Sequence, residues 1–165
     1  MGGMTHEERE FVRRFAELLT SYGCKCFLEE RPDGSNKRID LIANHPKFGY
    51  IGFEAKHINT LGQGAVIAKA VEQIQEYRKY TYFNGVKIER WVFLPKFDNL
   101  AFESGDRVLE FIRSFLRHYD IYFARVNERT GYWKQDTNKW INETFLEVSI
   151  GYGFPNSITL NPYEH

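Results

Sequence analysis

The strongest constraint on the fold comes from two short segments, Arg38-Ile39-Asp40-Leu41-Ile42 and Ile51-Gly52-Phe53-Glu54-Ala55-Lys56. In both, charged residues alternate with apolar and β-branched ones, a pattern typical of strands with one buried face. The residues between them, Asn44 to Gly49, are rich in turn formers. The two segments are therefore expected to form an antiparallel hairpin centred on Lys47.

This hairpin would bring charged side chains together. Asp40 and Glu54 are equidistant from Lys47, so their side chains would face each other at about 5 Å. Strand periodicity puts Lys56 on the face of Glu54, and Phe53 on the opposite face. Facing carboxylates repel each other unless a cation lies between them, and hard oxygen ligands suit Mg²⁺ or Mn²⁺. Because a nearby lysine can orient water or stabilise charge on a phosphate, the pattern predicts a hydrolytic site for a phosphodiester.

The two segments resemble the motif of the PD-(D/E)XK nuclease superfamily, an acidic residue near the end of one strand followed by Glu-X-Lys on the next. Asp40, Glu54, Ala55 and Lys56 stand in those positions, and Ile39 replaces the usual proline. The resemblance implies that Asp40, Glu54 and the Ala55 backbone carbonyl hold Mg²⁺ or Mn²⁺, and that Lys56 positions the attacking water. The alternative for Glu54 and Lys56 is a solvated charge pair on a strand face.

An amphipathic helix is expected from Thr5 to about Tyr22. Thr5 and Glu8 have the spacing of a capping box. Many nucleases of the resembled superfamily place a further glutamate in this helix, which reaches the same metals. Glu8 is thus a candidate metal ligand and catalytic residue as well as a helix cap, and Glu7 is the other contender.

A second amphipathic helix is expected from about Ala65 to Tyr80, with Gln73 and Tyr77 one turn apart on it. RecB-like exonucleases of the same superfamily carry Gln-X-X-X-Tyr after Glu-X-Lys. That resemblance makes Gln73 a candidate catalytic residue and Tyr77 a candidate contact to nucleic acid. The alternative is a surface glutamine beside a packed tyrosine.

Other candidate contacts to nucleic acid are basic residues near the hairpin. Residues 31–36 form a polar segment rich in turn formers. Such a loop can follow a nucleic-acid backbone through Arg31, Lys37 and Arg38, and His57 after the hairpin can contact a phosphate. A plain solvated loop and a histidine without a chemical role are the alternatives.

The expected order of elements is a helix, three strands, a helix, a strand over Lys87 to Leu94 that ends at Pro95, then a further helix and strand. A helix between two strands allows a right-handed crossover to a parallel neighbour. This order predicts an α/β fold with a restriction-endonuclease-like αβββαβ core, a mixed sheet flanked by helices, and a C-terminal αβ and aromatic-rich extension.

Length and composition limit the organisation of the chain. Its 165 residues suit a single nuclease domain over residues 1–165, with the core at about 5–94 and the extension at about 95–165. The expected final helix and strand cover 107–118 and 121–126. The aromatic residues that follow are expected to cover a sheet edge or a subunit interface rather than to stack on bases. Cys24 and Cys26 are expected to be free thiols.

Charge and hydropathy exclude some functions. Lys plus Arg and Asp plus Glu are 22 each, so the net charge is zero. That balance argues against a broad non-specific grip on nucleic acid. It does not argue against a nuclease, since local fields and a bound cation supply positive charge. No apolar run approaches membrane-spanning length and the N-terminus does not resemble a signal peptide, so the cytoplasm is the expected location.

The resemblance to the PD-(D/E)XK superfamily implies a Mg²⁺-dependent nuclease that acts on DNA. Within that superfamily the single-domain size and Phe53-Glu54-Ala55-Lys56 look similar to Holliday-junction resolvases and phage recombination nucleases, which favours an endonuclease of recombination, repair or phage DNA processing. A resolvase-like enzyme would be a homodimer, because a junction presents two symmetric strands. A RecB-like DNA exonuclease is the first alternative. A non-catalytic nucleic-acid-binding module that keeps the nuclease fold is the alternative from another class.

Overall fold

The computed structural model describes residues 4–21, 23–46, 48–58, 64–97, 112, 114–129, 132–141, 145–151 and 158–160. The two labelled helices are α1 (His6–Ser21) and α2 (Gly64–Tyr77), and residues 114–118 are also helical. The strands are β1 (Lys25–Glu30), β2 (Ile39–His45), β3 (Gly49–Ile58), β4 (Tyr82–Phe83), β5 (Val86–Phe97), β6 (Tyr122–Arg129), β7 (Tyr132–Lys134), β8 (Lys139–Ile141), β9 (Phe145–Gly151) and β10 (Ile158–Leu160).

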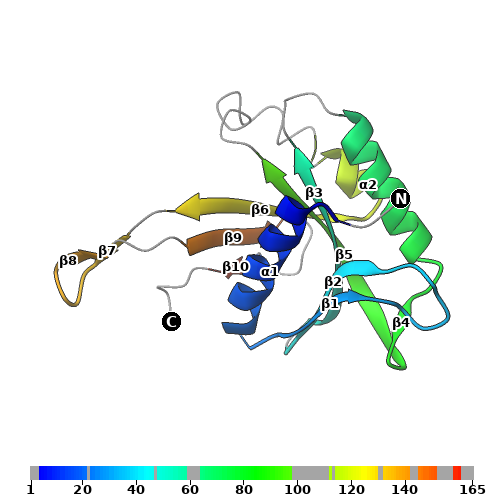
Figure 1. Ribbon diagram of the computed structural model, residues 1–165, viewed down its shortest axis with the longest axis horizontal. Coiled ribbons are helices and arrows are strands. Elements are labelled where there is room, and N and C mark those ends of the chain that lie inside the picture. Colours follow the sequence, from blue (N-terminus) through cyan, green and yellow to red (C-terminus); the bar gives the residue numbers. More distant parts are fainter. Residues whose placement is uncertain are drawn as a thin grey trace.

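One mixed sheet organises the molecule, with strand order β1-β2-β3-β5-β6-β9-β10 and β4 paired to β5 (Figure 1). The first three strands are antiparallel, and α2 then leads the chain from β3 to its parallel neighbour β5. β6 is parallel to β5, and β9 and β10 continue antiparallel from β6. Apart from the short β4, the order from α1 to β5 is the expected αβββαβ order, so the predicted fold class is confirmed.

The two helices bury their apolar faces on opposite sides of the sheet. Full burial of one large apolar side chain contributes about 1.5–3 kcal/mol, so these layers fix the helices firmly on the sheet. The cluster on the α1 side includes Phe11, Val12, Phe15, Leu19, Leu41, Phe53 and Ala55. The cluster on the α2 side includes Ile67, Ala70, Val71, Ile74, Ile42, Trp91, Phe93 and Leu116.

The β2–β3 hairpin has the register that the sequence predicts. Its pairs run from His45 opposite Gly49 to Leu41 opposite Phe53, which centres the hairpin on residue 47. The ladder between the two strands ends at Leu41. Beyond that point β2 stays paired with β1, and β3 stays paired with β5 as far as Ile58. The strands therefore separate just where Asp40 and Glu54 occur.

A second hairpin, β4–β5, was not expected. Its turn is Asn84-Gly85, and both residues have positive φ, 51° and 78°. Two consecutive left-handed residues are typical of a type I′ turn, which matches the twist of the flanking strands. Asn-Gly between apolar residues is a strong hairpin signal, so the sequence carried this information.

The expected end of the fourth strand at Pro95 is wrong. β5 continues to Phe97, with Pro95 opposite Lys56. On its other side β5 pairs with β6 at Val92 and Phe93 alone within the described residues. Proline is tolerated where a strand has no ladder partner on one side, which explains why the strand continues.

The C-terminal region extends the sheet. β9 and β10 cover the edge of β6, as the aromatic-rich segment was expected to do, while the small β7–β8 hairpin projects from the sheet (Figure 1). The expected helix over 107–118 lies mostly outside the described residues, and its described part is helical. Cys24 and Cys26 are free thiols. In the described part of the chain, no helix is both long and apolar enough to cross a membrane.

Candidate active site

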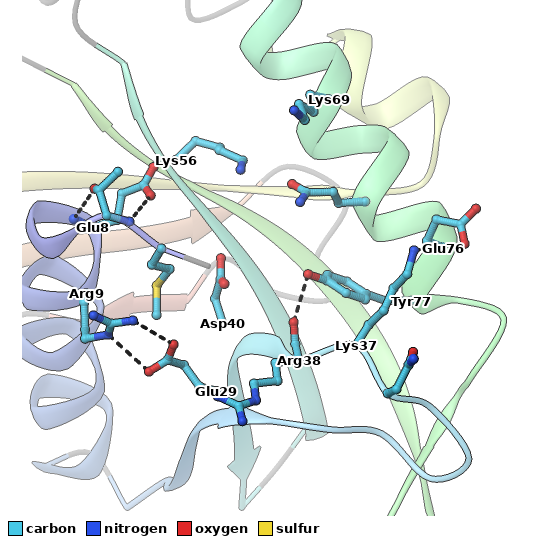
Figure 2. Close-up of a pocket in the computed structure, with 14 residues that line it drawn as sticks. Glu8, Arg9, Glu29, Lys37, Arg38, Asp40, Lys56, Lys69, Glu76 and Tyr77 are labelled. Carbon is cyan, nitrogen blue, oxygen red and sulfur yellow. Dashed lines mark hydrogen bonds and ion pairs between the residues drawn. The ribbon is translucent and has the colours of Figure 1, made fainter. Parts of the chain in front are cut away.

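A cavity of about 810 Å³ opens between α1, the segment that joins β1 to β2, and α2 (Figure 2). It borders the point at which β2 and β3 separate. Charged and polar side chains dominate its lining. The lining residues are Met4, Thr5, Glu8, Arg9, Glu29, Asn36, Lys37, Arg38, Asp40, Lys56, Lys69, Gln73, Glu76 and Tyr77.

Asp40 lies at the start of the gap between β2 and β3. Its Oδ2 accepts a hydrogen bond of 2.8 Å from the backbone N–H of Ala55. The side chain thus takes the place of a ladder acceptor after the regular pairing has ended. The N–H and C=O of one residue in an extended strand point to the same side of that strand. Because the Ala55 N–H is directed at Asp40, the Ala55 carbonyl is expected to face β2 as well.

Glu54 is held by two donors on the cavity side of the sheet. Its side chain is 2% exposed, with Oε2 3.4 Å from Lys56 Nζ and Oε1 3.1 Å from the Tyr77 hydroxyl. Phe53 and Ala55 pack in the cluster on the α1 side. The predicted division of the β3 side chains between the two faces is confirmed.

Burial and mutual repulsion set the charge of the two carboxylates. Burial raises the pKa of Asp40 to about 6, against the opposing effects of the Ala55 N–H and the Lys56 ammonium. Burial and the charge of Asp40 raise the pKa of Glu54 to about 8. Burial and the two carboxylates also raise the pKa of Tyr77, so its hydroxyl stays a donor. A pair of acids with raised pKa values is typical of functional sites.

Tyr77 is a supporting residue of this site. It is 6% exposed, and its ring stacks on Trp91 with centroids 5.8 Å apart. Its hydroxyl also lies 3.0 Å from the Arg38 carbonyl oxygen (Figure 2). The buried ring has no room to stack on a base, so any contact of Tyr77 to nucleic acid would use the hydroxyl.

Trp91 in turn packs closely on β3. A Cβ added to Gly52, the neighbour of Trp91 in the parallel ladder, would lie 2.5 Å from the indole ring. No side chain fits at that distance. Glycine at position 52 therefore lets Trp91 lie flat on the sheet, where it supports Tyr77 and, through it, Glu54.

Glu8 forms the predicted capping box. The Thr5 N–H donates to Glu8 Oε1 at 2.9 Å, and the Glu8 N–H donates to Thr5 Oγ1 at 3.2 Å. Glu8 Oε2 accepts a further hydrogen bond of 2.9 Å from the N–H of His57. Glu8 thus fastens the start of α1 to β3 and lines the cavity, while its role as a metal ligand stays a prediction. Glu7 is exposed and lies 3.0 Å from His57 Nδ1.

Gln73 lies on the cavity side of α2, one turn before Tyr77. Its Oε1 is buried and has no hydrogen-bond partner among the described residues. An unpaired buried acceptor costs about 1–3 kcal/mol unless a bound molecule supplies a donor. This position is consistent with the candidate role of Gln73, which stays a prediction.

The expected nucleic-acid contacts divide into two groups. Lys37 and Arg38 line the cavity, whereas Arg31 and His57 are not among its lining residues. Lys37 lies 3.5 Å from Glu76, on α2. Contacts from any of the four to nucleic acid stay predictions.

Two basic residues of the cavity were missed from the sequence, Arg9 and Lys69. Arg9 on α1 pairs with Glu29 on β1 at 3.1 Å, a contact that depends on how the helix packs. Lys69 lies one turn before Gln73 on α2, and this spacing was available in the sequence. A lysine four residues before a candidate site residue is a weak signal until the cavity is known.

The donor set suits a hard divalent cation. The buried Glu54 and the half-buried Asp40, both with raised pKa values, gain most from a cation that relieves their repulsion, and oxygen ligands are those that Mg²⁺ prefers. Within the described residues, no three or more His, Cys, Asp or Glu side chains form a group able to hold a metal ion. A cation here would therefore rely on Asp40, Glu54, backbone oxygen and water, which is compatible with the water-rich coordination of Mg²⁺.

No family model matches the sequence, and no curated protein matches it. The solved structure of Pyrococcus furiosus SfsA in complex with Ca²⁺ is similar to it with a TM-score of 0.40 and 14% identity. The match covers 73% of this chain and 56% of that chain, so this chain spans little more than half of that protein's length. At this level the likeness carries no argument, and the function is inferred from the residues of the site.

Proposed function

We propose that this chain is a Mg²⁺-dependent nuclease that hydrolyses phosphodiester bonds of DNA. The observation that carries the proposal is the group formed by Asp40, Glu54 and Lys56 beside the cavity, with Lys56 Nζ 3.4 Å from Glu54. Two carboxylates and one ammonium at the edge of a polar cavity provide both cation binding and stabilisation of negative charge. That combination is what phosphodiester hydrolysis requires.

The roles of the residues follow from their positions. Asp40 and Glu54, with the Ala55 carbonyl, would hold Mg²⁺, which supplies Lewis acidity and lowers the pKa of water when bound. Lys56 stabilises the charge that develops on the phosphate and orients the attacking water. Tyr77 fixes the rotamer of Glu54 by donating to Oε1. Glu8 supports the site by joining α1 to β3.

Internal cleavage, as in a resolvase-like endonuclease, is favoured over cleavage from an end. The Gln73–Tyr77 pair is the feature that resembles RecB-like exonucleases. Tyr77 has a sufficient structural role without recognition of a DNA end, because it is buried on Trp91 and donates toward Glu54. The pair therefore gives no independent support for end recognition.

The direct test is incubation of the protein with linear, covalently closed circular and four-way-junction DNA, with Mg²⁺ and with EDTA. Nicking or relaxation of the circle that needs Mg²⁺ and is lost in Glu54→Gln supports the endonuclease. Consumption of linear DNA alone would favour the exonuclease. Equal activity of the wild type and Glu54→Gln would contradict the proposal, because a contaminating enzyme would then explain the cleavage.

A further inference from the structure

Five basic residues line the cavity, and they differ in whether an acid neutralises them. Three have an acidic partner: Arg9 with Glu29 at 3.1 Å, Lys37 with Glu76 at 3.5 Å, and Lys56 with Glu54 at 3.4 Å. Arg38 and Lys69 are exposed and form no ion pair with any residue that the structure describes. Arg38 and Lys69 are therefore the cations of the lining that stay available to an anionic ligand.

Arg38 and Lys69 lie on opposite sides of the candidate active site. Lys69 belongs to α2, and Arg38 directly precedes β2. In Figure 2 Asp40 lies between them. A chain of phosphates that passes over Asp40 would therefore meet a cation before and after the reacting group.

The backbone at Arg38 is held in place from two directions. The Arg38 carbonyl lies 3.0 Å from the Tyr77 hydroxyl. The preceding loop is fastened by Asp33, whose carboxylate accepts hydrogen bonds of 3.0 Å and 2.8 Å from the N–H groups of Asn84 and Gly85. A fixed backbone with an exposed guanidinium is a suitable anchor for a phosphate, because little order has to be gained on binding.

We propose that a nucleic-acid strand crosses this cavity from Arg38 to Lys69, with the phosphate to be cut over Asp40 and a neighbouring phosphate bound by each of the two cations. Lys69 is thereby assigned as a phosphate-binding residue. Arg38 can bind its phosphate through two parallel hydrogen bonds, whereas Lys69 acts as a point charge. The position of the central phosphate over Asp40 rests on the proposed function. The positions of the two neighbouring phosphates rest only on Arg38 and Lys69.

Binding of a fluorescein-labelled 20-nucleotide DNA strand, measured in EDTA by fluorescence anisotropy at several salt concentrations, tests the path. Lys69→Gln and Arg38→Gln should each weaken binding by about tenfold at low salt, the factor expected for one lost charge-assisted hydrogen bond. Each should also reduce the slope of log affinity against log salt by about 0.7, because one phosphate contact is lost. In the double variant the two losses of affinity and the two reductions in slope should add, since the two residues bind different phosphates.

Two further variants control for charge and folding. Lys87→Gln removes the same charge from an exposed position on β5 outside the cavity lining, and it should change binding little. Lys69→Arg keeps the charge and should bind as the wild type does. Because Lys69 is exposed on a helix, thermal unfolding should be unchanged in all its variants.

The outcomes separate this path from the proposed function. If Lys69→Gln binds as tightly as Lys87→Gln while the wild type cleaves DNA with Mg²⁺, the path is wrong and the nuclease proposal stands. If Lys69→Gln weakens binding as expected but no DNA is cleaved, the path stands and the nuclease proposal fails. A wild-type protein that does not bind the strand overturns the path, and the nuclease proposal then depends on the cleavage assay with Mg²⁺ alone.

Discussion

Glu8 and Glu54 are 8% and 2% exposed, yet their carboxylates have very different partners. Glu8 accepts hydrogen bonds from two backbone N–H groups, that of Thr5 directly before its own helix and that of His57 in β3. Glu54 contacts the Tyr77 hydroxyl and the Lys56 ammonium, which stabilise its charge. The negative charge of Asp40 opposes ionisation of Glu54. Backbone donors are fixed by the fold, so Glu8 is suited to hold the structure together. Glu54 keeps an unfavourable neighbour, which a cation would relieve.

The largest expected difference between the two glutamates concerns activity. Glu54→Gln should lower DNA cleavage by about 10²–10³-fold, the loss typical of a main electrostatic contributor. Lys56→Ala should have an effect of similar size. Glu8→Gln should lower cleavage far less, because Glu8 acts through the position of α1. Initial rates with Mg²⁺ on purified proteins measure this, and equal losses in Glu8→Gln and Glu54→Gln would place both acids on the metal.

The second largest expected difference between the two glutamates concerns how the stability of the protein depends on pH. The raised pKa values of Asp40 and Glu54, about 6 and about 8, mean that the folded state binds more protons than the unfolded state above about pH 4. In EDTA, stability should therefore be highest at low pH within the folded range and fall as pH rises toward 8. The change should exceed about 1 kcal/mol, since one pKa unit is worth about 1.4 kcal/mol.

Urea unfolding at pH 5 and pH 8 measures this change. Glu54→Gln removes one of the two titrating groups and should therefore flatten the profile more than Glu8→Gln, which leaves both groups in place. A wild-type profile that rises between these pH values would show that repulsion within the carboxylate pair is not the controlling factor.

The ranking of the two variants expected for activity should be reversed for stability at a single pH. Glu8→Gln should cost about 1–2 kcal/mol, because the amide has one acceptor oxygen in place of two, so either the Thr5 N–H or the His57 N–H loses its acceptor and the other keeps only a neutral one. Glu54→Gln should leave stability unchanged or raise it slightly, as repulsion with Asp40 disappears. Urea unfolding at pH 7 in EDTA compares them, and a large loss in Glu54→Gln would contradict the contrast.

Mg²⁺ should stabilise the wild type by an amount set by mass action. At a Mg²⁺ concentration ten times the dissociation constant the gain is about 1.4 kcal/mol. The gain should vanish in Glu54→Gln and persist, though reduced, in Glu8→Gln. Thermal unfolding at increasing Mg²⁺ measures it, and complete loss in Glu8→Gln would identify Glu8 as a direct ligand.

The smallest expected effect concerns the support of Glu54. Tyr77→Phe keeps the stack on Trp91 and removes the hydroxyl near Glu54 and the Arg38 carbonyl. It should cost about 1 kcal/mol of stability, the net worth of one hydrogen bond. Activity should fall by less than in Glu54→Gln. If cleavage is unchanged, Glu54 does not depend on Tyr77 for its position.

The sequence was sufficient where the information is local. The register of the β2–β3 hairpin follows from its centre at residue 47, and the faces of Glu54 and Phe53 follow from alternation. The cap by Glu8 follows from a spacing of three residues. The Asn84-Gly85 turn is equally local, because the residue pair itself is the signal for a two-residue hairpin turn.

What could not be predicted depends on contacts between distant elements. The second oxygen of Glu8 reaches a backbone group 49 residues away, and no pattern in the sequence encodes that distance. The position of Lys69 across the cavity from Arg38 depends on how α2 packs on the sheet. The predicted strand end at Pro95 is wrong for a related reason. Whether a strand can contain a proline depends on which strands pair with it, and the sequence does not show the neighbours of β5.

The close contact between Gly52 and Trp91 has a consequence for how this chain can vary during evolution. A side chain at position 52 would overlap the indole, and a smaller residue at position 91 would remove the surface on which Tyr77 stacks. Neither position can change alone without cost, so substitutions at the two should arise as compensating pairs. Relatives that have lost Trp91 should show a larger residue at position 52. Coupled variation of these two positions in aligned sequences would then show that Trp91 supports Tyr77 and the site.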